Sequence, residues 1–311
     1  MPKPRNRLAD YCQYLALRLL AMLVHMFDVR TNYRTARWLG ELLWRIDRKH
    51  RRIATAHLRL SFPDWPGDRI DRVARKSFHN LAYLALEVLL TPRLVTLNRW
   101  RRHIRLREIA PGLRAVIRRD SGVILVTPHL GNWEIVGYTL AMLGFASVAV
   151  ARPLDNPYVN DFIMGVRERT GMSVLGKFGA AGDMSAVLQR RGVLAFVADQ
   201  DAGRRGVFVD FFGRPASTYR AIGLMALRHE VPILVAYGKR LSDRFEFEIG
   251  IARVIHPHEW ADKDDELTWI TQQFTTALEQ VAREAPEQYL WAHRRWKHRP
   301  GGKKAAGDGI A

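Results

Sequence analysis

Short apolar runs alternate with segments of helical periodicity from about residue 120 to residue 285. The runs are rich in β-branched residues and bounded by turn formers, as buried strands are. Strands are expected at 122–127, 146–150, 192–197, 232–237 and 245–251, and helices at 135–143, 156–170, 184–189, 221–228 and 267–284. This alternation predicts an α/β fold in which a sheet is covered by helices on both faces.

The amino-terminal part of the chain has mostly helical periodicity, with a basic segment at 38–60 and a long amphipathic helix at 68–90. An apolar segment at 11–27 is interrupted by Arg18 and His25 and has no cleavage site after it. A spanning helix needs ~20 mostly apolar residues. We therefore expect a helix that lies on a membrane surface, the alternative being a core helix of the domain.

These patterns divide the chain into three parts. Residues 1–95 are predicted to be a helical, membrane-associating region, and residues 96–300 an α/β domain. Residues 301–311 are glycine-rich and polar, and we expect a disordered tail there.

Candidate chemistry lies where the buried strand at 122–127 ends. Pro128 stops the strand, and His129 and Glu134 then bracket a Gly-Asn turn before an apolar helix. A continuous helix would splay these two side chains roughly 140° apart, so they can meet only if the chain turns between them. A carboxylate against the imidazole would make His129 a better general base. The alternative is a satisfied histidine beside a Glu that serves the helix dipole.

Composition narrows the possible partners. The 311 residues are 48% hydrophobic, which is ample for a core, and carry a formal charge of +18. Such an excess indicates a polyanionic neighbour, which could be nucleic acid, an anionic membrane face or an acidic or phosphorylated substrate. The single cysteine, Cys12, rules out an internal disulfide. No His/Cys cluster has zinc-ligand spacing, and His256 and His258 are interpreted as surface residues, so no metal is expected.

The residues 129–134, H-L-G-N-W-E, resemble the His-x4-acid motif of the membrane glycerolipid acyltransferases in its Glu form. The surrounding residues resemble one branch, the lipid A biosynthesis (lauroyl/myristoyl-type) acyltransferases. Further similar blocks follow in the same order, at 152–157, 167–171, 198–213 and 287–300. The resemblance extends from about residue 51 to the C-terminal region.

The resemblance implies transfer of an acyl chain from an acyl carrier protein or CoA thioester to a hydroxyl of an anionic glycolipid. The acceptor would be a lipid A precursor at the cytoplasmic face of the inner membrane, and a phosphatidylinositol mannoside is the close alternative. His129, oriented by Glu134, would deprotonate the acceptor hydroxyl. Backbone N–H groups at Gly131 and Asn132, or an arginine, would stabilise the oxyanion. No cofactor is expected, because the thioester is a substrate.

Several other side chains are candidates for substrate binding. Arg152 and Arg167 are expected to hold phosphate, with surface ion pairs as the alternative. Asp199 and Asp201 follow a buried strand and would serve the active site or cap a turn, without a distinction between them. The remaining candidates come from the similar blocks and are Asn156, Arg204, Arg294 and Arg295. Phe208, Phe211 and Phe212 would form an acyl-chain rim or, alternatively, a hydrophobic strand that returns to the core. Trp291 and Trp296 would lie at a membrane interface or, alternatively, at a solvated helix end.

Two other classes of function remain open. A basic nucleic-acid-binding protein would explain the charge, but it leaves His129 and Glu134 unexplained and no recognition motif is present, so nucleic acid is not expected. A thioesterase could use the same two residues. A serine hydrolase and a P-loop enzyme are disfavoured, because their motifs are missing. Acyl-chain length and oligomeric state do not follow from the sequence.

Overall fold

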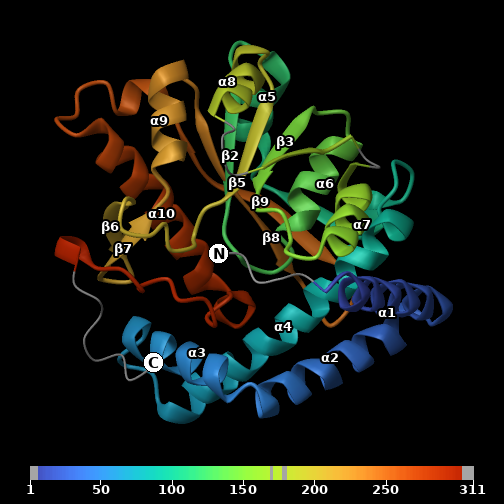
Figure 1. The fold of residues 1–311 in the computed structure, drawn as a ribbon. Coiled ribbons are helices and arrows are strands. Elements are labelled where there is room, and N and C mark those ends of the chain that lie inside the picture. The colour runs from blue at the N-terminus through green and yellow to red at the C-terminus, as the bar shows by residue number, and fades with distance from the viewer. Residues whose placement is uncertain (1–5, 169–170, 177–180, 303–311) are drawn as a thin grey trace.

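A seven-stranded mixed sheet lies at the centre of the molecule, in the order β1-β9-β8-β2-β5-β3-β4 (Figure 1). The computed structural model describes residues 6–168, 171–176 and 181–302. All neighbouring strands are parallel except β8 and β9, which are antiparallel. The strands are β1 (Ile104–Arg107), β2 (Val123–Thr127), β3 (Ser147–Ala151), β4 (Ser173–Gly176), β5 (Val193–Val197), β8 (Ile233–Arg240) and β9 (Phe247–Ile255).

Helices cover both faces of this sheet, as the alternating pattern predicted. Successive residues of β2 point to opposite faces. Val123 and Leu125 belong to a core with α4, α5 and α6, whereas Ile124 and Val126 belong to a core with α8, α9 and α10. The six helices are α4 (Gly67–Leu94), α5 (Ala110–Arg118), α6 (Glu134–Met142), α8 (Ala181–Gln189), α9 (Arg220–His229) and α10 (Glu266–Glu284). Burial on both faces explains why the central strands read as continuous apolar runs.

The amino-terminal region is helical, as predicted, and consists of α1 (Arg7–Met26), α2 (Val29–Ile46), α3 (Arg48–Ser61) and the start of α4. The expected segment at 38–60 is two helices, because Asp47 ends α2 and its carboxylate accepts the N–H of His50 to begin α3. Helix α1 packs on α7 (Pro157–Glu168) through Tyr11 and Tyr158, whose ring centroids lie 5.5 Å apart. In the described residues, no helix has both the length and the apolar character needed to cross a bilayer.

The segment that follows α10 is buried, which corrects the expectation of a basic-aromatic surface. Trp291 and Trp296 are 1% and 5% exposed, and they pack with α3, α4 and the hairpin of β6 (Val207–Phe211) and β7 (Arg214–Thr218). Phe211 and Phe212 belong to the same core and therefore do not form a rim for an acyl chain. Two isolated tryptophans in a basic run gave no sequence signal of burial. Of the expected tail, residues 303–311 lie outside the described residues.

Candidate active site

The register of the central sheet brings His129 and Asp199 together. Thr127 of β2 pairs with Val197 of β5, so the residues two positions beyond each strand end lie side by side. The distance between Nδ1 of His129 and Oδ1 of Asp199 is 2.5 Å. The backbone N–H of His129 also donates to Oδ2 of the same carboxylate, at 2.8 Å. Asp199 therefore fixes both the ring and the backbone of His129.

Asp199 is ionised at this position. Its side chain is only 2% exposed. Burial by itself would raise the pKa of Asp199, but the charge and hydrogen bonds of His129 outweigh it and hold that pKa below its usual value. A carboxylate can only accept hydrogen bonds, so in the neutral form of the His129 ring the proton lies on Nδ1. The lone pair on Nε2 is then available to take a proton.

Gln200 and Trp133 lie next to the ring of His129. The side-chain nitrogen of Gln200 is 3.2 Å from Nε2 of His129. The ring of Trp133 meets the imidazole edge to face, with 4.8 Å between centroids. An amide donor thus lies at the position where an acceptor hydroxyl would have to approach the base.

Glu134 does not supply the hydrogen bond to Nδ1 of His129 that the motif led us to expect. It forms a bidentate ion pair with Arg167 of α7, with nitrogen–oxygen distances of 3.0 and 2.6 Å. Both side chains are about one-fifth exposed, at 24% and 19%. Because its guanidinium fork faces a carboxylate, Arg167 is also not placed as the phosphate ligand we expected. The pair instead connects the start of α6 to α7.

The expected oxyanion donors are already occupied. The N–H of Gly131 donates to the carbonyl of Gln288 at 3.1 Å, and that of Asn132 to the carbonyl of Gly238 at 2.8 Å. Gly131 has a φ of +57°, and a Cβ atom there would lie 2.1 Å from the oxygen of Gly238. We call residues 128–132 the catalytic turn. Its backbone is held in place by β8 and by the segment after α10.

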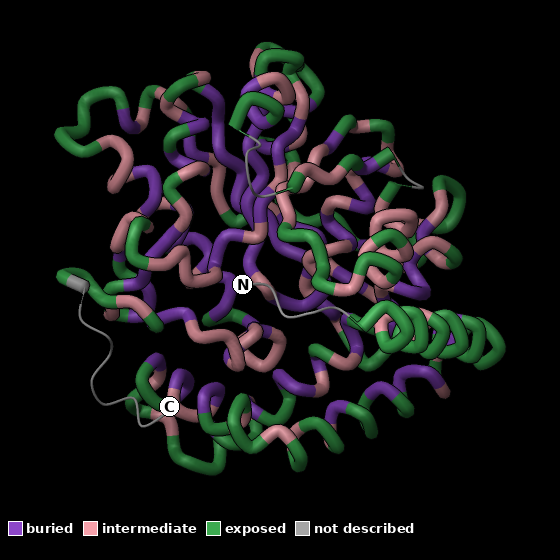
Figure 2. The backbone as a smooth tube through the Cα atoms, viewed as in Figure 1, coloured by how far each residue is buried: buried purple, intermediate pink, exposed green. Residues whose placement is uncertain are grey.

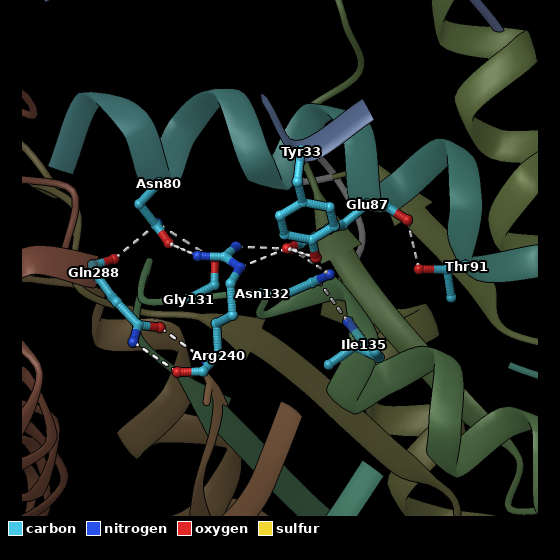
Figure 3. A network of polar contacts seen from close by, with 9 residues as sticks. All are labelled: Tyr33, Asn80, Glu87, Thr91, Gly131, Asn132, Ile135, Arg240 and Gln288. Atoms are coloured by element: carbon cyan, nitrogen blue, oxygen red, sulfur yellow. Dashed lines mark hydrogen bonds and ion pairs between the residues drawn. The ribbon is translucent and has the colours of Figure 1, made fainter. Parts of the chain in front are cut away.

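A buried ion pair lies behind the catalytic turn (Figure 3). Glu87 of α4 is fully buried and binds Arg240, at the end of β8, with distances of 2.5 and 2.8 Å. The side-chain nitrogen of Asn132 donates to Glu87 at 3.1 Å, and its oxygen accepts the N–H of Ile135 at 3.0 Å. The hydroxyl of Tyr33, on α2, also donates to Glu87, at 2.6 Å. Asn132 thus acts through its side chain, as an anchor of the turn and of α6.

Asn80 and Gln288 complete this network. Arg240 donates to the side-chain oxygen of Asn80 at 2.6 Å, and the side-chain nitrogen of Asn80 donates to the carbonyl of Gln288 at 2.9 Å. The side chain of Gln288 in turn bonds both backbone groups of Arg240, at 2.8 and 2.9 Å. We did not identify these residues from the sequence. The available signal was a single Glu in the apolar run L-A-L-E-V-L-L, at Glu87.

The structure gives different contacts to Asp199 and Asp201, between which the sequence made no distinction. Asp201 binds Nδ1 of His298 at 2.7 Å, and its N–H donates to Nε2 of His293 at 3.1 Å. Burial lowers the pKa of His293 to about 4, so this ring is neutral at physiological pH. Asp199 therefore contacts the candidate base, whereas Asp201 holds the C-terminal segment.

The other predicted substrate ligands lie elsewhere. Arg152 is 70% exposed and pairs with Asp155 at 3.1 Å, and Arg204 is exposed on a loop. Asn156 accepts the N–H of Val159 at the start of α7 and donates to the Asp10 carbonyl of α1.

The two arginines of the C-terminal segment differ in burial. Arg295 is buried and donates to the carbonyl of Ser217 and the hydroxyl of Thr218, which makes it a structural residue. Arg294 is half-buried. Among the described residues, no cluster of His, Cys, Asp and Glu side chains has a geometry that would hold a metal ion.

Comparison with known proteins identifies the family of this chain. The family model for the bacterial lipid A biosynthesis acyltransferases matches residues 3–298. The chain belongs to this family. It is 26% identical over 276 residues to the lipid A biosynthesis lauroyltransferase of Escherichia coli, covering 87% of this chain and 86% of that protein. It is 24% identical over 255 residues to the lipid A biosynthesis palmitoleoyltransferase of the same organism, covering 81% and 80%.

A second group of relatives matches over a shorter stretch. The phosphatidylinositol mannoside acyltransferase of Mycobacterium tuberculosis is 32% identical over 130 residues, which is 40% of this chain and 41% of that protein. Both groups of relatives are acyltransferases. The protein is accordingly an O-acyltransferase, and His129 lies in the motif through which it first resembled this family.

Proposed function

We propose that the enzyme transfers a fatty acyl chain from a thioester, carried by acyl carrier protein or CoA, to a hydroxyl of a lipid A precursor. The family match over most of the chain supports the acceptor class. The observation that carries the chemistry is the contact between His129 and the buried carboxylate of Asp199. It leaves one ring nitrogen as a base at the carboxyl end of the central strands, where open α/β sheets bind ligands.

The reaction then follows from the atoms present. Nε2 of His129 takes the proton of the acceptor hydroxyl as its oxygen attacks the thioester carbonyl and a C–O bond forms. Asp199 stabilises the imidazolium that results. The tetrahedral intermediate collapses, the C–S bond breaks, and the departing thiolate receives the proton from Nε2. The products are the acylated glycolipid and the free thiol of the carrier.

The oxyanion needs a donor that the backbone of the catalytic turn does not supply. The side-chain amide of Gln200 lies beside Nε2 of His129, so it would be near the thioester carbonyl when the acceptor hydroxyl is at Nε2. We assign it the role of the oxyanion donor. An amide at this position stabilises the negative charge without competing with His129 for a proton.

The amino-terminal helix supports a membrane-surface location. Large apolar side chains recur on one face of α1 at helical spacing and are exposed to solvent. Most residues of this helix are coloured as exposed in Figure 2. Their exposed fractions are 72% for Leu8, 48% for Leu15, 58% for Leu19, 60% for Met22 and 75% for Met26. A contiguous apolar face of this kind is typical of a helix that lies in the headgroup region. We propose that α1 binds the membrane in this way.

The positive charge of the chain supports a location at the cytoplasmic face of the membrane. A formal charge of +18 favours an anionic leaflet, and it also suits an acidic carrier protein as donor. We therefore place the enzyme at the cytoplasmic face of the inner membrane. Replacing Leu19 and Met22 by Glu is expected to move the protein from sedimented membranes to the supernatant at unchanged fold, measured by circular dichroism.

The acceptor is tested by product analysis. Membranes containing the enzyme are incubated with labelled acyl carrier protein thioester or acyl-CoA, and with either a lipid A precursor or a phosphatidylinositol mannoside. Mass spectrometry follows both lipids and free fatty acid. One acyl-chain mass added to the lipid A precursor is the expected result. Acylation of the mannoside alone would show that the acceptor is a phosphatidylinositol mannoside and not a lipid A precursor. Free fatty acid without acylated lipid would show that the enzyme is a thioesterase.

A further inference from the structure

A basic cleft lies between α2, α4 and the turn that joins β8 to β9. Its volume is about 870 Å³, and its wall includes neither His129 nor Asp199. Arginine and lysine side chains converge on it from both helices, with Arg34 and Arg37 on α2 and Arg72, Arg75 and Lys76 on α4. We call it the α2–α4 cleft.

The two helices meet closely enough to make these cations face one another. Gly40 of α2 lies against α4, where a Cβ atom would be 2.7 Å from the Cα of His79. Arg34 and Arg37 are one turn apart on α2, and Lys76 and His79 are one turn apart on α4, so each pair shares a face of its helix. The charges therefore surround one volume instead of spreading over a convex surface.

Part of this charge is already neutralised within the protein. Glu41 binds Arg75 at 2.5 Å and His79 at 3.2 Å, and Asp68 binds Arg72 at 2.5 Å. Asp243 and Glu287 also line the cleft. Within the described residues, Arg34, Arg37 and Lys76 form no ion pair with a carboxylate. Burial lowers the pKa of His79, so this ring adds no fixed charge of its own. The cleft thus keeps a cluster of cations with capacity for an external anion.

The inner wall of the cleft is rigid. It is formed by Asn80, Arg240 and Gln288, whose side chains are fixed by the hydrogen bonds that also hold the catalytic turn (Figure 3). The charge of Arg240 is compensated by its ion pair with Glu87. An anion would therefore bind to the cations of α2 and α4 beside an inner wall that is already ordered. This order reduces the conformational entropy that is lost on binding.

We propose that the α2–α4 cleft binds a phosphate group. Guanidinium groups present planar forks that match phosphate oxygens, and an ammonium group adds a point charge. The inference goes beyond acyl transfer, because binding here uses none of the residues that carry that reaction. A phosphorylated lipid headgroup and the phosphates of a soluble thioester donor share this chemistry, and competition separates them.

Calorimetry with inorganic pyrophosphate on the detergent-solubilised full chain tests the site. The variant Arg34→Gln/Lys76→Gln removes two cations of the cleft. The matched control Arg114→Gln/Arg118→Gln removes two exposed arginines from α5, at the opposite end of the molecule (Figure 1). The cleft variant is expected to bind pyrophosphate about tenfold more weakly or worse, since a hydrogen bond to a charged group is worth at least that factor. The control is expected to bind like the wild type.

Equal affinity of the cleft variant and the wild type would overturn the proposal. Equal weakening in both variants would also overturn it, because it would show a response to net charge alone. Where the cleft variant alone is weakened, competition identifies the source of the phosphate. Displacement of pyrophosphate by dioctanoyl phosphatidic acid supports a lipid headgroup, and displacement by CoA supports the soluble donor.

Discussion

The carboxylate of Asp199 lies 2.5 Å from Nδ1 of His129, although 70 residues separate them in the chain. The sheet register alone produces this contact, because both residues follow neighbouring parallel strands. Glu134, which is near His129 in the sequence, binds Arg167 instead. The acid that contacts the candidate base is therefore the distant one.

Replacement of Asp199 by Asn should reduce kcat by about 10²–10⁴-fold. The side-chain amide can donate to Nδ1, which would move the ring proton to Nε2 and remove the base. Asp201→Asn is the matched control, because Asp201 binds His298 instead of His129. The reduction of kcat in Asp201→Asn should be smaller than about 10²-fold. Initial rates of lipid acylation measure both, and similar losses in the two variants would refute the assignment.

Gln200→Ala should lower kcat by about 10²-fold with little change in KM, as expected for a donor that acts on the transition state. Gln200→Glu should lose at least as much, because a carboxylate would repel the developing oxyanion. Steady-state kinetics with both substrates varied separates the two parameters. A raised KM at unchanged kcat would mean that Gln200 binds substrate and does not stabilise the oxyanion.

The buried pair Glu87–Arg240 should be essential to stability. Glu87→Gln leaves a buried guanidinium without its counter-charge, so we expect a loss of about 3–5 kcal/mol in the free energy of unfolding. The double variant Glu87→Leu/Arg240→Met removes both charges and should be less destabilised than the single variant. Denaturant unfolding gives these values. A single-variant loss below about 1 kcal/mol would show that the network is dispensable.

His293 should make the enzyme less stable in mild acid. Its pKa is about 4 in the folded state, against a usual value of 6.5. Between these values the unfolded chain binds the extra proton, so stability falls as pH decreases from 6.5 towards 4 and is fully recovered above that window. The slope from this group is at most about 1.4 kcal/mol per pH unit. In His293→Gln, the free energy of unfolding should depend less steeply on pH between 4 and 6.5 than in the wild type. An unchanged dependence would contradict the lowered pKa of His293.

The strands and helices of the core were predictable because their burial on two faces leaves a strong local pattern. The strand at 122–127 and the helix at 267–284 were found within a few residues. The short strand β1 pairs with β9, which is distant in the sequence, and so it leaves little local pattern. In the β6–β7 hairpin, β6 was foreseen only as the alternative for 208–212, and its sequence neighbour β7 was missed. The break between α2 and α3 depends on a single capping aspartate, Asp47.

The candidate site shows the same division. His129 was identified from a local motif. Asp199 was a candidate because it follows a buried strand, but its contact with His129 depends on the strand register, which no local pattern reveals. Arg295 and Trp296 lie in a run of basic and aromatic residues that resembles a surface, yet both are buried by the β6–β7 hairpin. Charged residues in a core carry no periodic signal, and so the Glu87–Arg240 network was also missed.

The most direct test of the account compares His129→Ala with His258→Ala, which removes an exposed histidine outside the site. Both are assayed in membranes with acyl carrier protein thioester and a lipid A precursor, and mass spectrometry follows the lipid. The account predicts one added acyl chain with the wild type and with His258→Ala, and none above background with His129→Ala. An equal mass gain with His129→Ala would show that His129 is structural and that the catalytic base lies elsewhere.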